Sequence, residues 1–466
     1  MAESQPITEY EQKRLENIKQ NDLKIASLKL HSIAMELSSK RQRTEKPKNP
    51  KAETPIVGAR RSLRTKGFQP DPSSAKGLSN YYVGCPVKHA KSQLLKKLGP
   101  LCMQDIFFGD SSDRTLINTI NDISENTPLS SLEKRGFVGN GGCFDSSSMV
   151  LKRENIVHAA LGRIMEMKFF PCIDRSMIVA GDAFGDVVFW NVDCEEGEGE
   201  GGGIYRYRPY TLPVSGISIK PFSLSKVFTS SYDGFIRMLD FKSESFEFIH
   251  KSDSSIFSLS QRPQDPNLIY FSENQGFLNI WDTRAGKSSS SYVLHDAKIY
   301  TIDFNPVNTY VMATSSADKT ARIWDLRQMS SKGPKCLKSH QHKTAVHSAY
   351  FSPSGKSLAT TSLDNHVVIF SGVDLENASI IYHNNHTGKW ISSFRAIWGW
   401  DDTSLFTGSM IKEVDVIHTD GGISHLRSSD MMDIPCQLTA HPHKVGTLAA
   451  ATSGGQIYLW AQKVET

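Results

Sequence analysis

The chain has 466 residues, of which 39% are hydrophobic, and a formal net charge of +4, a length that fits one large domain or two to three ordinary ones. Its seven cysteines lie far apart without a CxxC pair, which argues against a disulfide framework or a cysteine zinc site. No run of 18 apolar residues and no secretory signal is present, so we expect no membrane association through a spanning helix.

The charge is unevenly distributed along the chain. Residues 1–100 hold 20 Lys and Arg against 9 Asp and Glu, whereas the other 366 residues hold 33 against 40. A basic arm on a mildly acidic body indicates a polyanionic partner for the arm. The alternative is a solvated tail that only aids solubility.

The basic N-terminal arm is predicted to be largely helical or disordered. Within 1–40, Thr8 and Glu11 form a capping box and apolar residues follow at near-helical spacing, which predicts an amphipathic helix over 7–38. Residues 41–86 are basic, rich in proline and poor in apolar residues, as in a disordered linker. A basic cluster typical of nuclear localisation or phosphate binding lies at their junction and consists of Lys40, Arg41, Arg43, Lys46 and Lys48.

Residues 87–144 are expected to form a loop-rich extension with one short helix. The stretch 87–99 can form a basic amphipathic helix that ends at Gly99 and Pro100. Residues 110–145 are expected to be mainly loops.

From about residue 145 onward, one pattern recurs with a period in the low to middle forties. An alternating apolar segment is followed by a strand pattern, a polar or glycine turn, and a strand that ends in a large residue. Seven copies end at Trp190, Leu239, Trp281, Trp324, Phe370, Ile417 and Trp460. Two-residue alternation between turns predicts β-strands, and this period with Trp-Asp ends is typical of WD-repeat blades. The sequence therefore predicts an all-β fold, a seven-bladed WD-repeat β-propeller, over residues 145–466.

The pattern also assigns structural roles to particular segments. We expect Ser146–His158 to supply the outer strand of the last blade, which would otherwise have an open edge. The stretch "HKVGTLAAAT", ending at Thr452, is interpreted as the first strand of the seventh blade. Carboxylates at tight turns are expected to accept backbone N–H bonds rather than to catalyse, namely Asp182, Asp233, Asp318 and Asp364.

No motif in the sequence indicates catalysis. There is no phosphate-binding glycine loop, no GxSxG and no HExxH, and no cysteine or carboxylate pattern completes a metal site around His340, His342 and His347. We therefore predict a protein that is not an enzyme and has no metal, cofactor or small-molecule substrate. Its propeller is expected to be a platform for partners.

Basic residues are predicted to gather at one end of the propeller, because the residues just before each blade's first strand share that end. Such cations can neutralise phosphates and bind DNA without sequence preference. The predicted DNA-binding residues are Arg163, Lys298, Lys343, Lys389, Trp390, Arg395 and Lys444. An aromatic residue beside a cation, such as Trp390 next to Lys389, can stack on an unpaired base or enter a duplex step; alternatively, Trp390 packs against its own blade.

Several stretches resemble the WD repeat-containing protein 76 family, itself similar to the small subunit of the UV-damaged-DNA-binding complex. The resemblance rests on "TEYEQKRLENIKQND" and "RRSLR" in the arm, and on "ATSSADKTARIWDLRQ" (313–328) and "HTGKWISSFRAIW" (386–398) in the repeats. In that small subunit a hairpin between the fifth and sixth blades inserts three residues into the duplex. The matching positions are Gly388, Lys389 and Trp390, with different identities.

The resemblance also implies partners and a cellular role. In WD-repeat receptors of cullin-4 ubiquitin ligases, the Trp-Asp-x-Arg box contacts the large damaged-DNA-binding subunit as adaptor, and Arg284 and Arg327 stand at that position. An ion pair within the propeller is the alternative role for these arginines. The resemblance thus implies a nuclear protein of the DNA-damage response that binds DNA and chromatin and serves as a ubiquitin ligase substrate receptor. The alternative is a scaffold that binds histone tails or other peptides without touching DNA.

Overall fold

The computed structural model of the chain separates into two compact units, residues 1–82 and 83–466. The residues it describes are 16, 19, 20, 98–109, 112–127, 144–194, 202–330, 333–372, 374–388 and 391–463. In the first unit these are Glu16, Lys19 and Gln20, which are helical and exposed. The basic cluster of Lys40, Arg41, Arg43, Lys46 and Lys48 lies outside the described residues, so its role stays a prediction. None of the described helices is long and apolar enough to cross a membrane.

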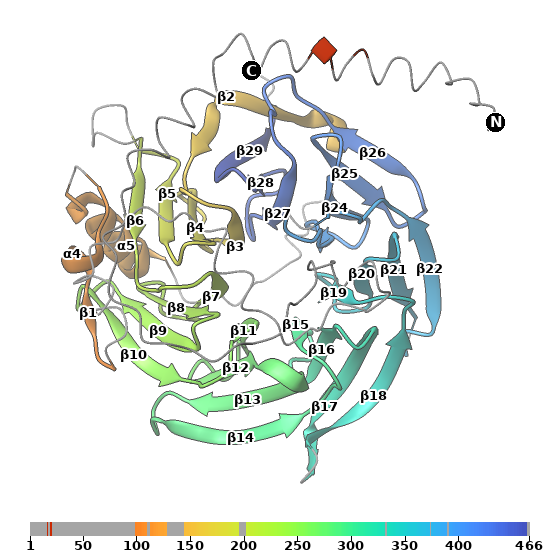
Figure 1. The fold of residues 1–466 in the computed structure, drawn as a ribbon, viewed down its shortest axis with the longest axis horizontal. Helices are drawn as coiled ribbons and strands as arrows, with labels where there is room; N and C mark the ends of the chain where they lie inside the picture. The colour runs from red at the N-terminus through yellow and green to blue at the C-terminus, as the bar shows by residue number, and fades with distance from the viewer. Residues whose placement is uncertain are drawn as a thin grey trace, which may run out of the picture. The chain divides into compact units, whose positions relative to one another are not determined.

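Seven antiparallel sheets form a ring around a central channel (Figure 1), so the predicted seven-bladed propeller is confirmed. Blade 1 consists of β3 (Ile164–Phe169), β4 (Met177–Asp182), β5 (Val187–Asn191) and β6 (Ile204–Tyr207). Blade 2 consists of β7 (Val214–Ile219), β8 (Lys226–Ser231), β9 (Phe235–Asp240) and β10 (Ser245–Lys251). Blade 3 consists of β11 (Ser258–Gln261), β12 (Leu268–Ser272), β13 (Phe277–Asp282) and β14 (Lys287–Val293).

The remaining blades repeat the same order from the channel outward. Blade 4 consists of β15 (Ile299–Phe304), β16 (Val311–Ser316), β17 (Thr320–Ser330) and β18 (Gly333–Gln341). Blade 5 consists of β19 (Val346–Phe351), β20 (Leu358–Ser362), β21 (His366–Ser371) and β22 (Asn377–Tyr382), and blade 6 of β23 (Ile397–Trp398), β24 (Ser404–Ser409), β25 (Glu413–His418) and β26 (Ile423–Leu426). Blade 7 consists of β27 (Pro435–Ala440), β28 (Leu448–Thr452), β29 (Gln456–Gln462) and β2 (Met149–His158).

The ring is closed by a strand from the beginning of the propeller. β2 pairs antiparallel with β29, with Leu151 opposite Trp460 and Val157 opposite Ile457. The last blade therefore combines three strands from the end of the chain with one from before blade 1, which confirms the closure predicted for residues 146–158.

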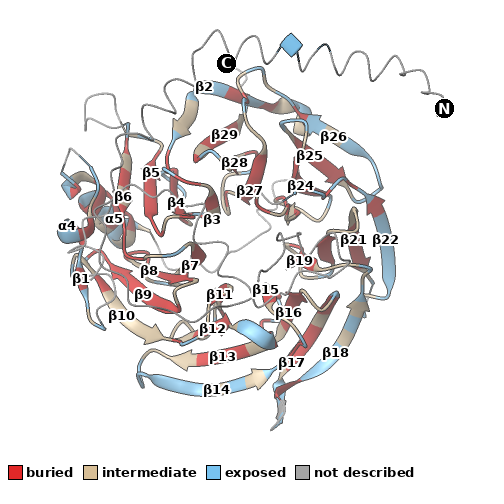
Figure 2. Cartoon of the chain, in the orientation of Figure 1, coloured by how far each residue is buried: buried red, intermediate tan, exposed pale blue. Residues whose placement is uncertain are grey.

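The middle strands of the blades carry the hydrophobic core. Figure 2 shows β4, β5, β9 and β28 as buried, whereas β14 and β22 on the outside are largely exposed. Of the seven large residues that end the repeats, Trp281 is partly buried and the other six are buried, with exposed fractions of 3% for Trp190, 5% for Trp324 and 1% for Trp460. They fill the space between neighbouring blades, as the apolar pattern predicts.

Residues before the propeller pack onto blades 1 and 2. β1 (Leu101–Cys102) adds a fifth strand to blade 2 by pairing with β10, and α4 (Met103–Ile106) follows it. α5 (Arg114–Asn126) buries Leu116, Ile120 and Ile123, among others, in the same core cluster. Loops were expected over 110–145, so this 13-residue helix is a correction. Its apolar residues recur at intervals of three and four, which is the spacing of one helix face.

The turn carboxylates hold their turns as predicted. Asp182 accepts the N–H groups of Phe184 and Asp186 at 2.8 and 2.9 Å. Asp318 accepts the N–H group of Thr320 at 2.9 Å. Asp233 and Asp364 make equivalent bonds with backbone N–H groups of their own blades. These side chains are architectural because their oxygens are occupied by the backbone.

Blade 4 contains a continuous chain of buried hydrogen bonds from its Trp to its turn Asp. The indole Nε1–H of Trp324 donates to Thr314 Oγ1 at 2.8 Å, and Thr314 lies 2.7 Å from His295 Nε2. His295 Nδ1 lies 2.8 Å from Asp318 Oδ2. The chain is consistent if Thr314 donates to Nε2 and the Nδ1–H of a neutral His295 donates to the carboxylate. Burial lowers the pKa of His295, which agrees with the neutral ring.

The direction of the strands defines two ends of the ring. Neighbouring strands run antiparallel, so residues before a first strand share an end with the turn between the second and third strands. We call this end the top face. The turn between the first and second strands, and the segment after the third, lie on the bottom face.

Candidate nucleic-acid interface

Three of the predicted DNA-binding residues lie on the top face, and a fourth, Arg395, lies in the channel. Arg163 precedes β3, Lys298 precedes β15 and Lys343 precedes β19, while Arg395 lies two residues before β23. Lys343 is exposed and the other three are partly buried. Arg163, Lys298 and Lys343 thus come from separate loops to one end of the ring, and their role in DNA binding stays a prediction.

Lys444 is an exception, and its predicted position is wrong. It lies in the turn between β27 and β28, so it is on the bottom face, where its Nζ donates to Ser176 Oγ at 2.9 Å. The stretch "HKVGTLAAAT" contains the second strand of blade 7, whereas the first strand is β27. Lys298 and Lys444 therefore face opposite ends of the propeller, and Lys444 is not part of the top-face cluster.

Lys298 is held between two aromatic rings. Its Nζ lies 5.2 Å from the ring centre of Phe257 and 5.1 Å from that of Tyr300. Within the described chain its ammonium group has no hydrogen-bond or ion-pair partner, and burial lowers its pKa. A cation on aromatic faces without a carboxylate partner keeps its charge available to an incoming anion.

The aromatic side chains around Lys298 continue along the top face. The Tyr232 and Phe257 rings are 5.3 Å apart, and the Tyr300 and His347 rings are 4.8 Å apart. Burial, with added repulsion from Arg395 and Lys298, lowers the pKa of His347 to about 4. The sequence analysis did not single out Tyr232, Phe257 or Tyr300 as site residues. The sequence could have indicated them, because each lies in or next to a turn or a strand start that the repeat places on the top face.

Arg395 is paired inside the channel. Its Nη1 lies 3.2 Å from Glu166 Oε2, and its side chain is 19% exposed. Glu166 also lies 3.5 Å from Lys168 Nζ. Both Arg395 and Glu166 line a channel cavity of about 540 Å³ that opens toward the first-to-second-strand turns. The charge of Arg395 is thus partly offset before any ligand arrives.

The predicted inserting loop is described only in part. Lys389 and Trp390 lie outside the described residues, so neither stacking on DNA nor packing on the blade is tested for Trp390. Just before them, His383 and Asn385 are buried, and Asn385 Nδ2 donates to the carbonyl oxygen of Ser362 at 2.9 Å. The segment that leads to the two residues is therefore anchored on blade 5.

Arg284 and Arg327 lie on the bottom face, after the Trp-Asp pairs of blades 3 and 4. Each pairs with the Asp two residues before it: Arg284 Nη2 with Asp282 at 3.3 Å, and Arg327 Nη2 with Asp325 at 2.9 Å. The intra-propeller ion pair considered as an alternative is therefore present. Both side chains still remain exposed, by 71% and 56%, so the guanidinium groups are oriented but accessible.

The three clustered histidines belong to the blade structure. His340 stacks on Phe370 with ring centres 3.6 Å apart, and His342 Nε2 lies 3.2 Å from Thr360 Oγ1. His347 packs on Tyr300.

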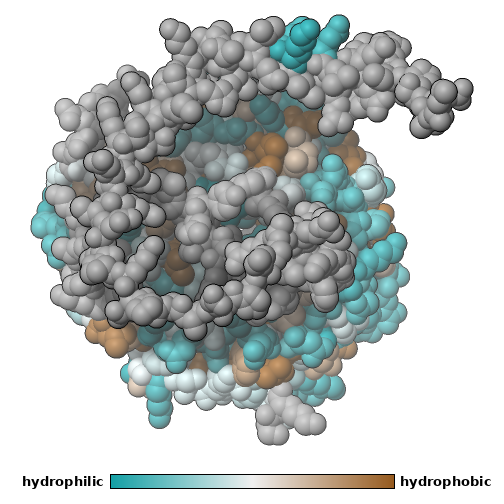
Figure 3. All heavy atoms as spheres, in the orientation of Figure 1, coloured by the Kyte–Doolittle hydropathy of each residue, from teal (hydrophilic) through white to brown (hydrophobic). Residues whose placement is uncertain are grey.

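The surface of the described part of the propeller is mainly hydrophilic in the view of Figure 3, with scattered apolar side chains.

Seven blades with four repeat strands each, together with the Trp-Asp pairs in the third strands of blades 3 and 4, define the class: the chain is a WD-repeat β-propeller protein. The family model of the "WD domain, G-beta repeat" matches residues 286–325 and 334–371, within blades 3 to 5.

Similarity to particular proteins extends over almost the whole chain. It is 28% identical to WD repeat-containing protein 76 of Xenopus laevis, over 97% of this chain and 80% of that protein. It is 25% identical to DNA damage-binding protein CMR1 of Phaeosphaeria nodorum, over 97% and 98%, and 30% identical to DNA damage-binding protein cmr1 of Neurospora crassa, over 64% of each. The resemblance to the WD repeat-containing protein 76 family is thereby confirmed.

Proposed function

We propose that this chain is a nuclear, non-catalytic propeller that binds damaged or distorted DNA through its top face in the DNA-damage response. The names of the CMR1 relatives, DNA damage-binding proteins, support a DNA-damage-related role. The observation that carries the proposal is Lys298, a cation on two aromatic rings without an acidic partner in the described chain. Arg163 and Lys343 add positive charge on the same face, and Lys389 and Trp390 belong to the proposed site by position.

A DNA-binding assay with two matched lysine variants tests this proposal. Lys298→Gln removes a top-face charge, whereas Lys444→Gln removes a bottom-face charge. We expect Lys298→Gln to weaken binding to bubble-containing duplex DNA and to lower the salt dependence of binding by about one phosphate contact. Lys444→Gln should leave both unchanged. Equal effects of the two variants would remove the top face as the site.

Trp390 is tested in the same assay. If it stacks on an unpaired base, Trp390→Ala weakens binding to bubble DNA more than binding to perfect duplex, by about 1–3 kcal/mol. Unchanged affinity for bubble DNA would place Trp390 outside the interface.

A second proposed function is that of substrate receptor for a cullin-4 ubiquitin ligase, through the bottom face. Arg284 and Arg327 support it because they are exposed, on adjacent blades, and held in fixed orientations by Asp282 and Asp325. Fixed guanidinium groups can form bidentate contacts with an acidic partner surface. Chromatin and histones are proposed as partners only of the DNA-bound protein.

Co-purification with the large damaged-DNA-binding subunit tests this second function. The double variant Arg284→Ala/Arg327→Ala should lose the adaptor, while Lys444→Gln on the same face should retain it. Retention of the adaptor by the double variant would exclude the predicted contact. If DNA binding does not change with salt concentration while peptides bind in the channel, the protein is instead a scaffold that binds histone tails or other peptides without touching DNA.

A further inference from the structure

One hairpin of blade 6 brings two carboxylates and an imidazole together. Side chains two residues apart on a strand share a face, so Glu413 and Asp415 of β25 lie on the same side. In the pairing of β25 with β26, Asp415 is directly opposite His425. The sequence shows no metal-binding motif here, because the grouping depends on strand register rather than on a short spacing.

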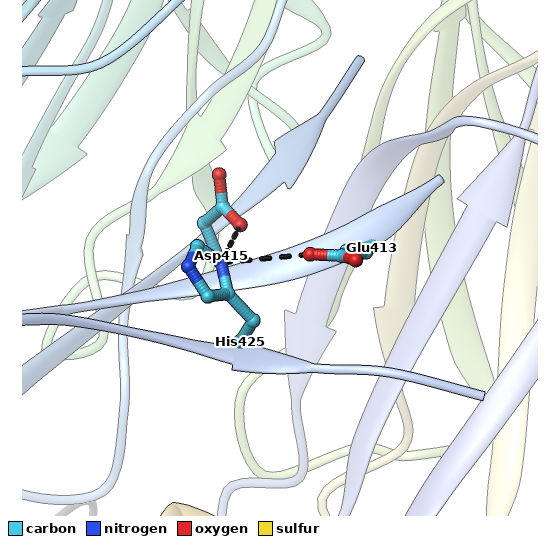
Figure 4. Close-up of side chains that lie close together, drawn as sticks. All are labelled: Glu413, Asp415 and His425. Atoms are coloured by element: carbon cyan, nitrogen blue, oxygen red, sulfur yellow. Dashed lines mark hydrogen bonds and ion pairs between the residues drawn. The ribbon is translucent and has the colours of Figure 1, made fainter. Parts of the chain in front are cut away.

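The three side chains converge on a small space (Figure 4). His425 Nδ1 lies 2.7 Å from Asp415 Oδ1 and 3.6 Å from Glu413 Oε2. One atom of each residue lies within 4.8 Å of the others. Ligand atoms around a tetrahedral ion with bonds near 2.0–2.1 Å are separated by about 3.3 Å. The separation of His425 Nδ1 from Asp415 Oδ1 is shorter than this value, and its separation from Glu413 Oε2 is longer. Small side-chain rotations would therefore bring the three atoms to the spacing of metal ligands.

The remaining oxygens of both carboxylates are held by other residues. Asp415 Oδ2 lies 3.0 Å from His383 Nε2, and Glu413 Oε1 lies 2.6 Å from Arg427 Nε. Outer partners of this kind fix the orientation of carboxylate ligands in metal sites. Each carboxylate therefore has one oxygen held from outside and the other directed toward the shared space.

One of these inward oxygens has no donor. Glu413 Oε2 is buried and has no hydrogen-bond partner in the described part of the chain. Burying an acceptor of a charged group without a donor is unfavourable. A bound cation would compensate it. His425 is 36% exposed, which leaves a path from solvent and room for water as a further ligand.

From this arrangement we propose that Glu413, Asp415 and His425 bind a divalent first-row transition-metal ion, with Zn²⁺ as the probe. Two oxygen ligands and one imidazole suit such ions rather than Ca²⁺ or Mg²⁺, which prefer all-oxygen shells. On binding, the ion replaces the proton that His425 shares with Asp415, so the ring takes the tautomer protonated at Nε2.

The site would also connect two blades. Asp415 contacts His383, which directly follows β22 and begins the segment leading to blade 6. A metal ion on Asp415 would fix this carboxylate and, through it, His383. The proposal does not depend on DNA binding, since none of the three proposed ligands belongs to the proposed DNA interface.

Zinc binding by the purified full-length chain tests the proposal. Equilibrium dialysis against Zn²⁺, with metal analysis, compares the wild type with His425→Ala, Glu413→Gln and the control His418→Ala. His418 lies on the same hairpin but bonds to Ser424 instead of the cluster. We expect the wild type and His418→Ala to bind one more Zn²⁺ per chain than the two cluster variants. Glu413→Gln preserves side-chain shape, so its loss of Zn²⁺ with an unchanged circular dichroism spectrum excludes unfolding as the cause.

A second readout identifies the ligands. The zinc X-ray absorption spectrum of the loaded wild type should show nitrogen and oxygen neighbours at about 2.0–2.2 Å and no sulfur. The proposal is overturned if the wild type binds no Zn²⁺ at micromolar concentration. It is also overturned if the cluster variants bind as much Zn²⁺ as His418→Ala.

Discussion

Arg395 and Glu166 form an ion pair between blade 6 and blade 1, with Arg395 Nη1 3.2 Å from Glu166 Oε2. Blade 7 lies between these two blades in the ring, so the pair connects first-strand positions that are not on adjacent blades. Neither side chain is more than 19% exposed, and solvent therefore screens the pair weakly.

Loss of this pair should destabilise the propeller. Arg395→Met leaves Glu166 poorly compensated in the channel, and we expect the free energy of unfolding to fall by about 1.5–3 kcal/mol. Urea denaturation followed by tryptophan fluorescence measures the change. Lys168→Met is the control, because Lys168 is 47% exposed and pairs with the same carboxylate; a similar loss in the control would argue against a special role for Arg395.

The hydrogen-bond chain of blade 4 yields a second prediction. Thr314→Val keeps the side-chain shape but removes the hydroxyl that joins Trp324 and His295, leaving two buried nitrogens without a partner. We expect a loss of about 1–3 kcal/mol in the free energy of unfolding. Thr403→Val is matched in chemistry but lies at an exposed turn, where its hydroxyl bonds to Asp401. Its effect should stay within about 0.5 kcal/mol, and equal losses would contradict the assigned role of the buried chain.

The acid stability of the protein should depend on Asp318. Burial opposes its ionisation, but hydrogen bonds from His295 and Thr320 outweigh burial and hold the pKa of this carboxyl below its usual range. The folded state therefore binds this proton more weakly than the unfolded state, whose Asp pKa is about 3.9. The stabilisation is present above that value and is lost as the pH falls toward the folded pKa.

Denaturation of Asp318→Asn at several pH values measures this effect. At pH 7 the variant should be less stable than the wild type by about 1–3 kcal/mol, and the difference should shrink below about pH 4. Asp253→Asn, at an exposed position, should follow the wild type throughout. A difference that stays constant down to pH 2 would show that the ionised form of Asp318 is not what stabilises the fold.

The extension before the propeller should contribute to stability. A chain that starts at residue 145 lacks Leu101, Met103, Ile106 and the buried face of α5, all in the core cluster of blades 1 and 2. Each large apolar side chain buried in such a cluster contributes about 1.5–3 kcal/mol. We expect residues 98–466 to unfold at a clearly higher temperature than residues 145–466 in a thermal melt. Coincident melts would mean that the extension only covers the propeller.

Much of the fold was predictable because the repeat is local. Seven copies of a two-residue alternation fixed the blade number, and the open edge of the last blade required a strand such as β2. Blade 7 was misassigned because "HKVGTLAAAT" and "LAAATSGGQIYLW" share residues 448–452, and one strand cannot be first and second at once.

The candidate sites were less predictable because their neighbours come from distant segments. The loop positions of Lys298 and Arg163 followed from the repeat, but the ion pair of Arg395 with Glu166 joins residues 229 positions apart. The helix α5 was not predicted, although Leu116, Ile120 and Ile123 recur at intervals of four and three residues. The grouping of Glu413 with His425 needed the register of one hairpin, which composition does not give.

The closure of blade 7 by β2 sets the order in which this protein can be completed. β2 leaves the ribosome before any complete blade, yet its partner β29 is synthesised only after the strands of blades 1 to 6. While blades 1 to 6 are synthesised β2 therefore has an unpaired edge, and the ring gains its closing contacts only once β29 has been made. Nascent chains that end prematurely, even within blade 7, would therefore lack closure altogether, so cells should degrade them instead of accumulating six-bladed remnants.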